Sequence, residues 1–188
     1  MNVIRQGQCL LLSFCLLSLA LPAIAQTSSS QVGDPYQKWL NEDVHWIITD
    51  QERAHFNKLT TDQQRDDFVR EFWEGRNPKP GAAENTFKEE HYRRLAYSNT
   101  HFAAGMPGYK SDRGHLYITF GKPDSIDSHP TLSPPTEVWH YAYIKGIGRN
   151  VVFTLSDECR CGDYTLAGGD RERIAPGTLD IGNPYPVN

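Results

Sequence analysis

Apolar residues recur every three to four positions between residues 34 and 104, which is the period of an amphipathic helix. Polar residues that cap free backbone amides precede these stretches, and two of them have the capping-box spacing. The pattern predicts four helices, which begin near Asp34, Thr49, Thr61 and Ala83. The third ends at Gly75–Gly81, because the two prolines of this segment cannot continue a helix. The fourth runs to about Ala104.

The period changes to strict alternation after residue 114, which is typical of strands with one buried face. Four strands are predicted, over His115–Phe120, Glu137–Ile144, Val151–Leu155 and, more briefly, Asp163–Ala167. Ser125–Pro135 is predicted to be a polar loop, and Gly146-Ile147-Gly148 a hairpin turn. Helices followed by strands indicate an α+β fold, in which N-terminal helices pack on a C-terminal antiparallel β-meander.

The first 33 residues follow neither period. A short segment whose only charged side chain is that of Arg5 precedes an almost wholly apolar run over residues 9–21. The small-x-small pattern Ala23-Ile24-Ala25 follows this run. We expect a secretory signal peptide that is cleaved after Ala25, and a periplasmic or extracellular mature protein. The run is shorter than the roughly 20 apolar residues of a membrane span, so no stable anchor is expected after cleavage. Neither Cys9 nor Cys15 has the context of a lipidation site.

Cleavage would leave 163 of the 188 residues, the size of one domain. Loss of Arg5 lowers the number of basic residues from 19 to 18 against 23 acidic residues, a net charge of −5. Nucleic-acid-binding proteins normally carry a basic surplus, so no nucleic-acid partner is expected. We divide the chain into a signal peptide (1–25), a flexible leader (26–33), a domain (34–167) and a Gly- and Pro-rich tail (168–188).

The motifs of the chain predict no metal, no cofactor and no catalytic residue. The seven His are scattered, and neither HExxH nor a paired CxxC occurs. The chain has no GxSxG nucleophile elbow. Gly146-Ile147-Gly148 lies between two predicted strands, whereas a dinucleotide-binding loop precedes a helix. His91 lies on the apolar face of the fourth predicted helix, which favours a hydrogen-bonded core residue.

Cys159 and Cys161 are the two cysteines of the predicted mature chain. Thiol pairs of exported proteins tend to oxidise, and a tight turn at Gly162-Asp163 would bring the two Cα atoms within the ~4.4–6.8 Å that a disulfide allows. We therefore expect a disulfide between them, one that is easily reduced. Two free thiols, an intermolecular bridge and a soft-metal pair are the alternatives.

Several motifs follow one another in order between Asp34 and Tyr164. They are Lys38-Trp39-Leu40-Asn41-Glu42-Asp43, Ile47-Ile48-Thr49-Asp50, Phe72-Trp73 before Arg76-Asn77-Pro78, Glu89-Glu90-His91-Tyr92-Arg93-Arg94, Pro107-Gly108-Tyr109-Lys110-Ser111-Asp112-Arg113-Gly114, Gly121-Lys122-Pro123-Asp124 and Glu137-Val138-Trp139-His140-Tyr141. This set resembles the GWxTD-domain family of exported bacterial proteins. The naming motif occurs here as Gly108–Asp112, with Tyr in place of the Trp and Ser in place of the Thr. The resemblance implies a fold and an exported location, and no particular reaction.

Gly108–Asp124 is the best candidate for a functional surface, because it gathers aromatic and charged side chains. The candidate binding residues are Tyr109, Asp112, Arg113, Tyr117 and Asp124. The charged pair could orient a polar ligand, and the rings could stack on a sugar or a peptide. A structural role for the same residues, in caps, ion pairs and tight backbone turns, is the interpretation that we favour.

Two functional hypotheses follow. The first is a non-catalytic binding or assembly module of the cell envelope, whose partner is another exported protein or an envelope polymer. The alternative is a hydrolase-like enzyme that uses Gly108–Asp124. An enzyme should have a pocket in which titratable groups converge, whereas a binding module should have an exposed apolar patch or an open strand edge.

Overall fold

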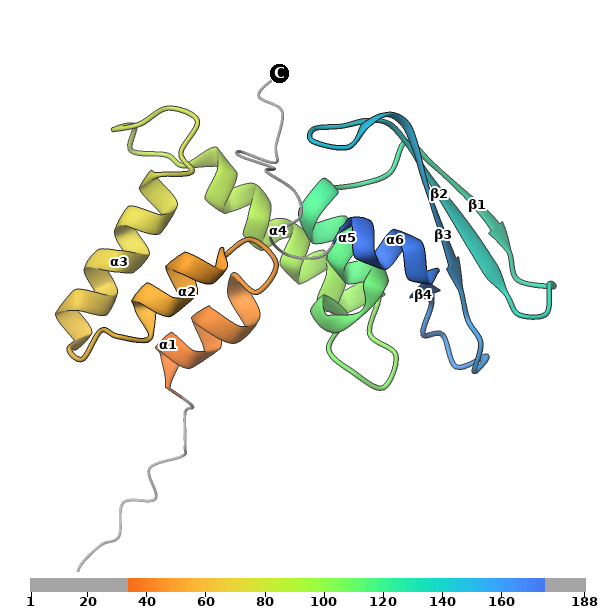
Figure 1. Cartoon of the computed structure of the whole chain (residues 1–188), viewed down its shortest axis with the longest axis horizontal. Helices are drawn as coiled ribbons and strands as arrows, with labels where there is room; N and C mark the ends of the chain where they lie inside the picture. The colour runs from red at the N-terminus through yellow and green to blue at the C-terminus, as the bar shows by residue number, and fades with distance from the viewer. Residues whose placement is uncertain (1–33, 175–188) are drawn as a thin grey trace, which may run out of the picture. The chain divides into compact units, whose positions relative to one another are not determined.

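The computed structural model describes residues 34–174, so the predicted signal peptide, the leader and most of the predicted tail lie outside the described residues. Helices come first along the chain, and a four-stranded antiparallel sheet of order β1-β2-β3-β4 follows (Figure 1). The predicted α+β fold with a C-terminal antiparallel meander is confirmed. Within the described range, none of the helices combines the length and the apolar character that crossing a bilayer would need.

The first three helices begin where the capping residues predict. Helix α1 (Pro35–Lys38) continues as the π-helical turn η1 (Trp39–Asp43), and α2 (Asp50–Phe56) and α3 (Asp62–Glu74) follow. Both capping boxes are present in full, Thr49 with Glu52 and Thr61 with Gln64. These elements bury one aromatic-rich core, made of Trp39, Leu40, Val44, Ile47, Ile48, Phe56, Phe72, Trp73 and Phe87.

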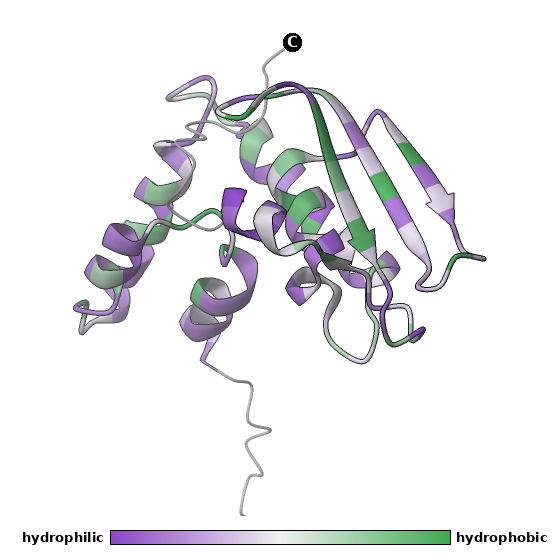
Figure 2. Cartoon of the chain, turned by 45° about the vertical axis from the view of Figure 1, so that its right-hand side comes forward, coloured by the Kyte–Doolittle hydropathy of each residue, from purple (hydrophilic) through white to green (hydrophobic). Residues whose placement is uncertain are grey.

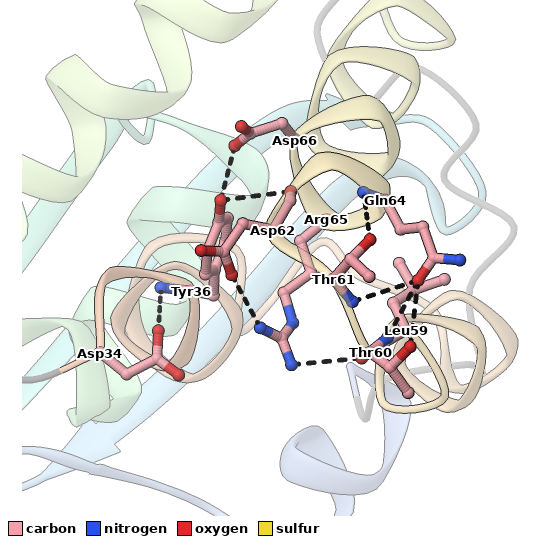
Figure 3. A network of polar contacts seen from close by, with 9 residues as sticks. All are labelled: Asp34, Tyr36, Leu59, Thr60, Thr61, Asp62, Gln64, Arg65 and Asp66. Atoms are coloured by element: carbon pink, nitrogen blue, oxygen red, sulfur yellow. Dashed lines mark hydrogen bonds and ion pairs between the residues drawn. The ribbon is translucent and has the colours of Figure 1, made fainter.

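Tyr36 joins α1 to the first turns of α3 (Figure 3). Its hydroxyl donates to Oδ1 of Asp66 at 2.8 Å and to the carbonyl of Asp62 at 3.3 Å. The hydrogen bond to Asp66 is the main reason that the pKa of Tyr36 is raised to about 12. Arg65 reaches back to the carbonyl of Leu59 at 3.2 Å, so the α2–α3 connection is tied to α3 as well.

Helix α4 (Thr86–His101) is followed by the 3₁₀ turn η2 (Gly108–Lys110) and by helix α5 (Asp112–Phe120). The strand predicted over His115–Phe120 is therefore wrong. Leu116 packs against the sheet while Ile118 packs against α4. A helix that is buried on several sides loses the one-sided 3.6-residue pattern, and its alternating residues then resemble a strand.

The sheet consists of β1 (Ser125–His129), β2 (Thr136–Ile144), β3 (Gly148–Ser156) and β4 (Thr165–Leu166). Cross-strand pairs place Ile126 beside Trp139 and Trp139 beside Phe153. The strands carry both hydrophobic and hydrophilic residues (Figure 2). The buried face forms a second core with Leu116, Trp139, Tyr141, Ile144, Val151, Phe153, Leu155, Leu166 and Ile174. Strand β1 lies in the predicted loop, so that prediction is wrong; all five β1 residues are exposed and lack apolar alternation.

A short helix, α6 (Gly168–Arg173), occupies the first residues of the predicted tail. Ile174 follows it and is 3% exposed, within the core below the sheet. The core of the domain thus continues past residue 167. The two glycines at the start of α6 concealed this helix in the sequence.

Candidate functional site

The backbone of the Gly108–Asp124 segment lies directly against α4 and against itself. A Cβ atom on Gly108 would lie 1.9 Å from the carbonyl oxygen of Ser98, and one on Gly114 would lie 1.9 Å from the carbonyl oxygen of Gly108. Real Cβ atoms do not approach other atoms this closely. Glycine is therefore required at both positions for close packing of η2 and α5.

Tyr109 points into the protein and is only 4% exposed. Its carbonyl accepts a hydrogen bond from the indole Nε1 of Trp46 at 2.7 Å, and its amide donates to Oδ1 of Asn99 at 2.9 Å. The aromatic residue of the naming motif thus joins the chain around Trp46 to helix α4. Its ring is not available to stack on a ligand.

Trp46 and His115 form a stacked pair beside this contact, with ring centroids 3.6 Å apart. Burial lowers the pKa of His115 to about 3, so the imidazole is neutral at physiological pH. Burial likewise lowers the pKa of the adjacent His45. These imidazoles act as packing groups.

Ser111 and Asp112 organise the start of α5. Oγ of Ser111 accepts from the amide of Gly114 at 3.0 Å and donates to the carbonyl of Gly108 at 2.8 Å. The Asp112 carboxylate accepts from the amide of Leu166 on β4 at 2.7 Å and also pairs with Arg171 on α6. Asp112 thus connects α5 to the last strand and the last helix of the described domain.

Arg113 pairs with Glu137 on β2 and not with its neighbour Asp112. The distance from Nη1 to Oε1 is 3.3 Å, and the two side chains are 13% and 15% exposed. Nη2 donates to the carbonyl of Gly162 at 2.5 Å, and the guanidinium lies 4.5 Å from the ring centroid of Tyr164. Arg113 therefore links α5 to the sheet and to the loop that follows β3.

The remaining two candidates, Tyr117 and Asp124, contact α4 and β2. Tyr117 is half-buried and stacks on Tyr97 of α4, with ring centroids 4.5 Å apart, and burial raises its pKa. Asp124 is exposed before β1, where Oδ2 accepts from the amide of Ala142 at 2.5 Å. The five candidate residues thus contact different parts of the chain, and the structure does not bring them together around one ligand position.

Two adjoining hollows lie on the N-terminal helices, with volumes of about 190 and 300 Å³. They share His55, Phe68 and Glu71, and neither is lined by a residue of Gly108–Asp124. Burial acts to raise the pKa of Glu52 in the larger hollow, but hydrogen bonds from Arg76 and Thr49 outweigh it and the pKa is lowered. Arg76 lies 2.8 Å from this carboxylate, so the two charges neutralise each other.

His91 is a core residue, as the sequence predicts. It is fully buried, and Nε2 donates to the carbonyl of Asp43 across 2.6 Å. Burial lowers the pKa of His91 to about 4. The imidazole therefore remains neutral and joins α4 to η1.

Cys159 and Cys161 are joined by a disulfide, with their Cα atoms 5.2 Å apart. Both cysteines are exposed, whereas the neighbouring Asp157 is 4% exposed. A carboxylate oxygen of Asp157 and the two sulfur atoms lie within 4.8 Å of one another. Neither sulfur of the disulfide is a thiolate, which is the form in which cysteine binds metals.

The two edges of the sheet differ. On the side of β4, this two-residue strand covers only Leu155 and Ser156 of β3, and the amide of its Leu166 donates to Asp112. In the described part of the chain, β1 pairs with β2 alone and forms the other edge (Figure 1). Ile126 at the second position of β1 is 47% exposed. The sequence does not predict this edge, because a polar five-residue strand has no distinctive pattern.

No curated protein and no solved structure matches the chain. The family model of the GWxTD domain matches residues 34–168, which contain nearly all of the described helices and the whole sheet. By this match, the chain belongs to the GWxTD domain family.

Proposed function

We propose that the mature domain is a non-catalytic binding module of the bacterial cell envelope, and that it binds an extended segment of another exported protein along β1. The observation that carries this proposal is the open edge of β1, whose five residues are all exposed. An unpaired strand edge presents a row of backbone donors and acceptors, which an added strand satisfies.

The chemistry of the edge favours a polypeptide over a polysaccharide. The donors and acceptors of a strand edge match the spacing of another extended peptide chain, about 4.7–4.9 Å away. Ile126 provides an apolar contact at the second position of this row, and Asp127 and His140 provide a polar pair 3.0 Å apart beside it. The single apolar contact at Ile126 and the polar groups around it would select the partner sequence.

Export is part of the proposal, and it rests on the signal-peptide pattern of residues 1–25. The Cys159–Cys161 disulfide supports it, because such bonds persist in oxidising compartments. The alternative, a hydrolase, has no comparable support. Asp112 and Arg113 are engaged in internal contacts, and neither of the two hollows described above is lined by a residue of Gly108–Asp124.

Site-specific cross-linking tests the β1 interface. A photo-reactive residue at position 128, which is also exposed on β1, should cross-link to a reproducible exported protein in the native envelope, and adding the substitution Ile126→Lys should prevent capture of that protein. The matched control is position 154 on β3, where Thr154 is exposed but pairs with Val138 of β2 on one side and accepts from the amide of Ala167 on the other. Equal capture from both positions, or capture that survives Ile126→Lys, would show that β1 is not the interface.

A further inference from the structure

The turn that carries the disulfide is built around the buried carboxylate of Asp157. Oδ1 accepts from the amide of Cys161 at 3.0 Å, and Oδ2 accepts from the amide of Gly162 at 2.8 Å. Arg160 and Gly162 have positive φ angles of 55° and 86°, which turn successive amides toward this carboxylate. These bonds involve no sulfur atom, so they hold the shape of the turn whether or not the disulfide is closed.

The disulfide itself adds little to the fold. It closes a loop with a single residue between the two cysteines, and the stabilisation from a cross-link grows with the length of the loop that it closes. The ends of the turn are already held by β3–β4 pairing, between Ser156 and Thr165, and by the bond from Arg113 to the carbonyl of Gly162. An exposed disulfide that the fold does not require can open and close while the domain remains folded.

We propose that Cys159 and Cys161 form a thiol–disulfide exchange site, whose co-reactant is a low-molecular-weight thiol or an exposed cysteine of another protein. An incoming thiolate attacks Sγ of Cys161 and forms a mixed disulfide. The bond to Cys159 breaks, and Sγ of Cys159 leaves with the electron pair and takes up one proton. A second thiolate then attacks the partner's sulfur in the mixed disulfide. Sγ of Cys161 is released with the electron pair and is protonated. In sum, two thiols are oxidised to one disulfide while the protein disulfide is reduced to two thiols.

Asp157 makes the two cysteines unequal. Its Oδ1 lies 3.3 Å from Sγ of Cys159, so in the open form the Cys159 thiol donates a hydrogen bond to the carboxylate. The negative charge disfavours a thiolate at Cys159, so Cys159 takes up its proton as it leaves, and Cys161 is the sulfur that forms the mixed disulfide with the partner. Asp157 is thus a positioning residue that selects which sulfur exchanges. This site is separate from β1 and does not depend on the proposed function.

The first test measures whether the disulfide exchanges in the folded protein. The full mature chain is equilibrated in glutathione buffers of increasing reducing strength, and its thiols are counted by maleimide gel shift alongside circular dichroism. We expect two thiols to appear together, with an unchanged spectrum, and to disappear again when glutathione disulfide is restored. Thiols that appear only when the spectrum reports unfolding would overturn the proposal.

The second test measures the inequality of the two sulfurs. In single-cysteine variants, the remaining Cys161 of Cys159→Ser should form a mixed disulfide with glutathione disulfide about threefold faster than the remaining Cys159 of Cys161→Ser. Adding Asp157→Asn to Cys161→Ser should remove this difference. The matched control, Glu158→Gln, removes a neighbouring exposed charge that Ser156 contacts, and it should leave the rates unchanged. Equal rates in the two single-cysteine variants would overturn the assigned role of Asp157.

Discussion

At the scale of single residues, His91 links the stability of the domain to pH. Burial lowers its pKa from 6.5 to about 4, whereas the unfolded chain has the ordinary value. Between these values the unfolded state binds more protons than the folded state, so stability is full above about pH 6.5 and falls as the pH drops toward 4. The shift corresponds to at most about 3 kcal/mol. His115, with a pKa near 3, adds to the same trend.

The substitution His91→Gln tests this expectation. The Gln amide can still donate to the carbonyl of Asp43, but it cannot titrate. Urea unfolding between pH 7.5 and 4.5 should show a shallower loss of stability than in the unmodified protein, and His115 and His45, whose pKa values burial also lowers, should contribute to the remaining slope. His129→Gln, at an exposed position of β1, is the control and should keep the original slope. An unchanged slope in His91→Gln would mean that this imidazole does not carry the acid sensitivity.

At the scale of elements, the Gly108–Asp112 motif serves to pack η2 and α5 against α4. We predict that Gly114→Ala lowers the free energy of unfolding by about 3 kcal/mol, because its Cβ would meet the backbone of Gly108 and no side chain can move aside. Chemical denaturation measures this loss. Gly169→Ala, a helical glycine with nothing within 4 Å of the added Cβ, should be neutral or slightly stabilising. A loss below about 1 kcal/mol for Gly114→Ala would contradict the packing role.

At the scale of the whole domain, two aromatic-rich cores hold the fold and the disulfide is accessory. A double variant with Cys159→Ser and Cys161→Ser should lose less than about 2 kcal/mol of stability, as expected for so short a loop. Differential scanning calorimetry at neutral pH, with the oxidised unmodified chain as reference, measures the change. Failure of the double variant to fold would show that the disulfide is structural, and would also count against the exchange site.

Much of the fold was predictable from local patterns. Thr49 with Glu52 and Thr61 with Gln64 start α2 and α3, and the alternation in β2 and β3 predicts the sheet. Capping and one-sided burial depend on residues close in sequence, so their patterns are visible without a structure. The local pattern does not predict helix α5 or strand β1. Helix α5 is buried on several sides, and β1 is buried on none.

The sequence by itself determined the α+β class, the helix starts, the core position of His91 and the family motifs. The tertiary structure decided what the candidate residues do. Asp112 and Arg113 are adjacent in the chain, yet one contacts β4 and α6 while the other contacts β2. It also decided that β1 forms an edge of the sheet in the described part of the chain and that the buried Asp157 lies against the disulfide. These partners lie on different elements or depend on the exact turn of the backbone, and no local pattern encodes such contacts.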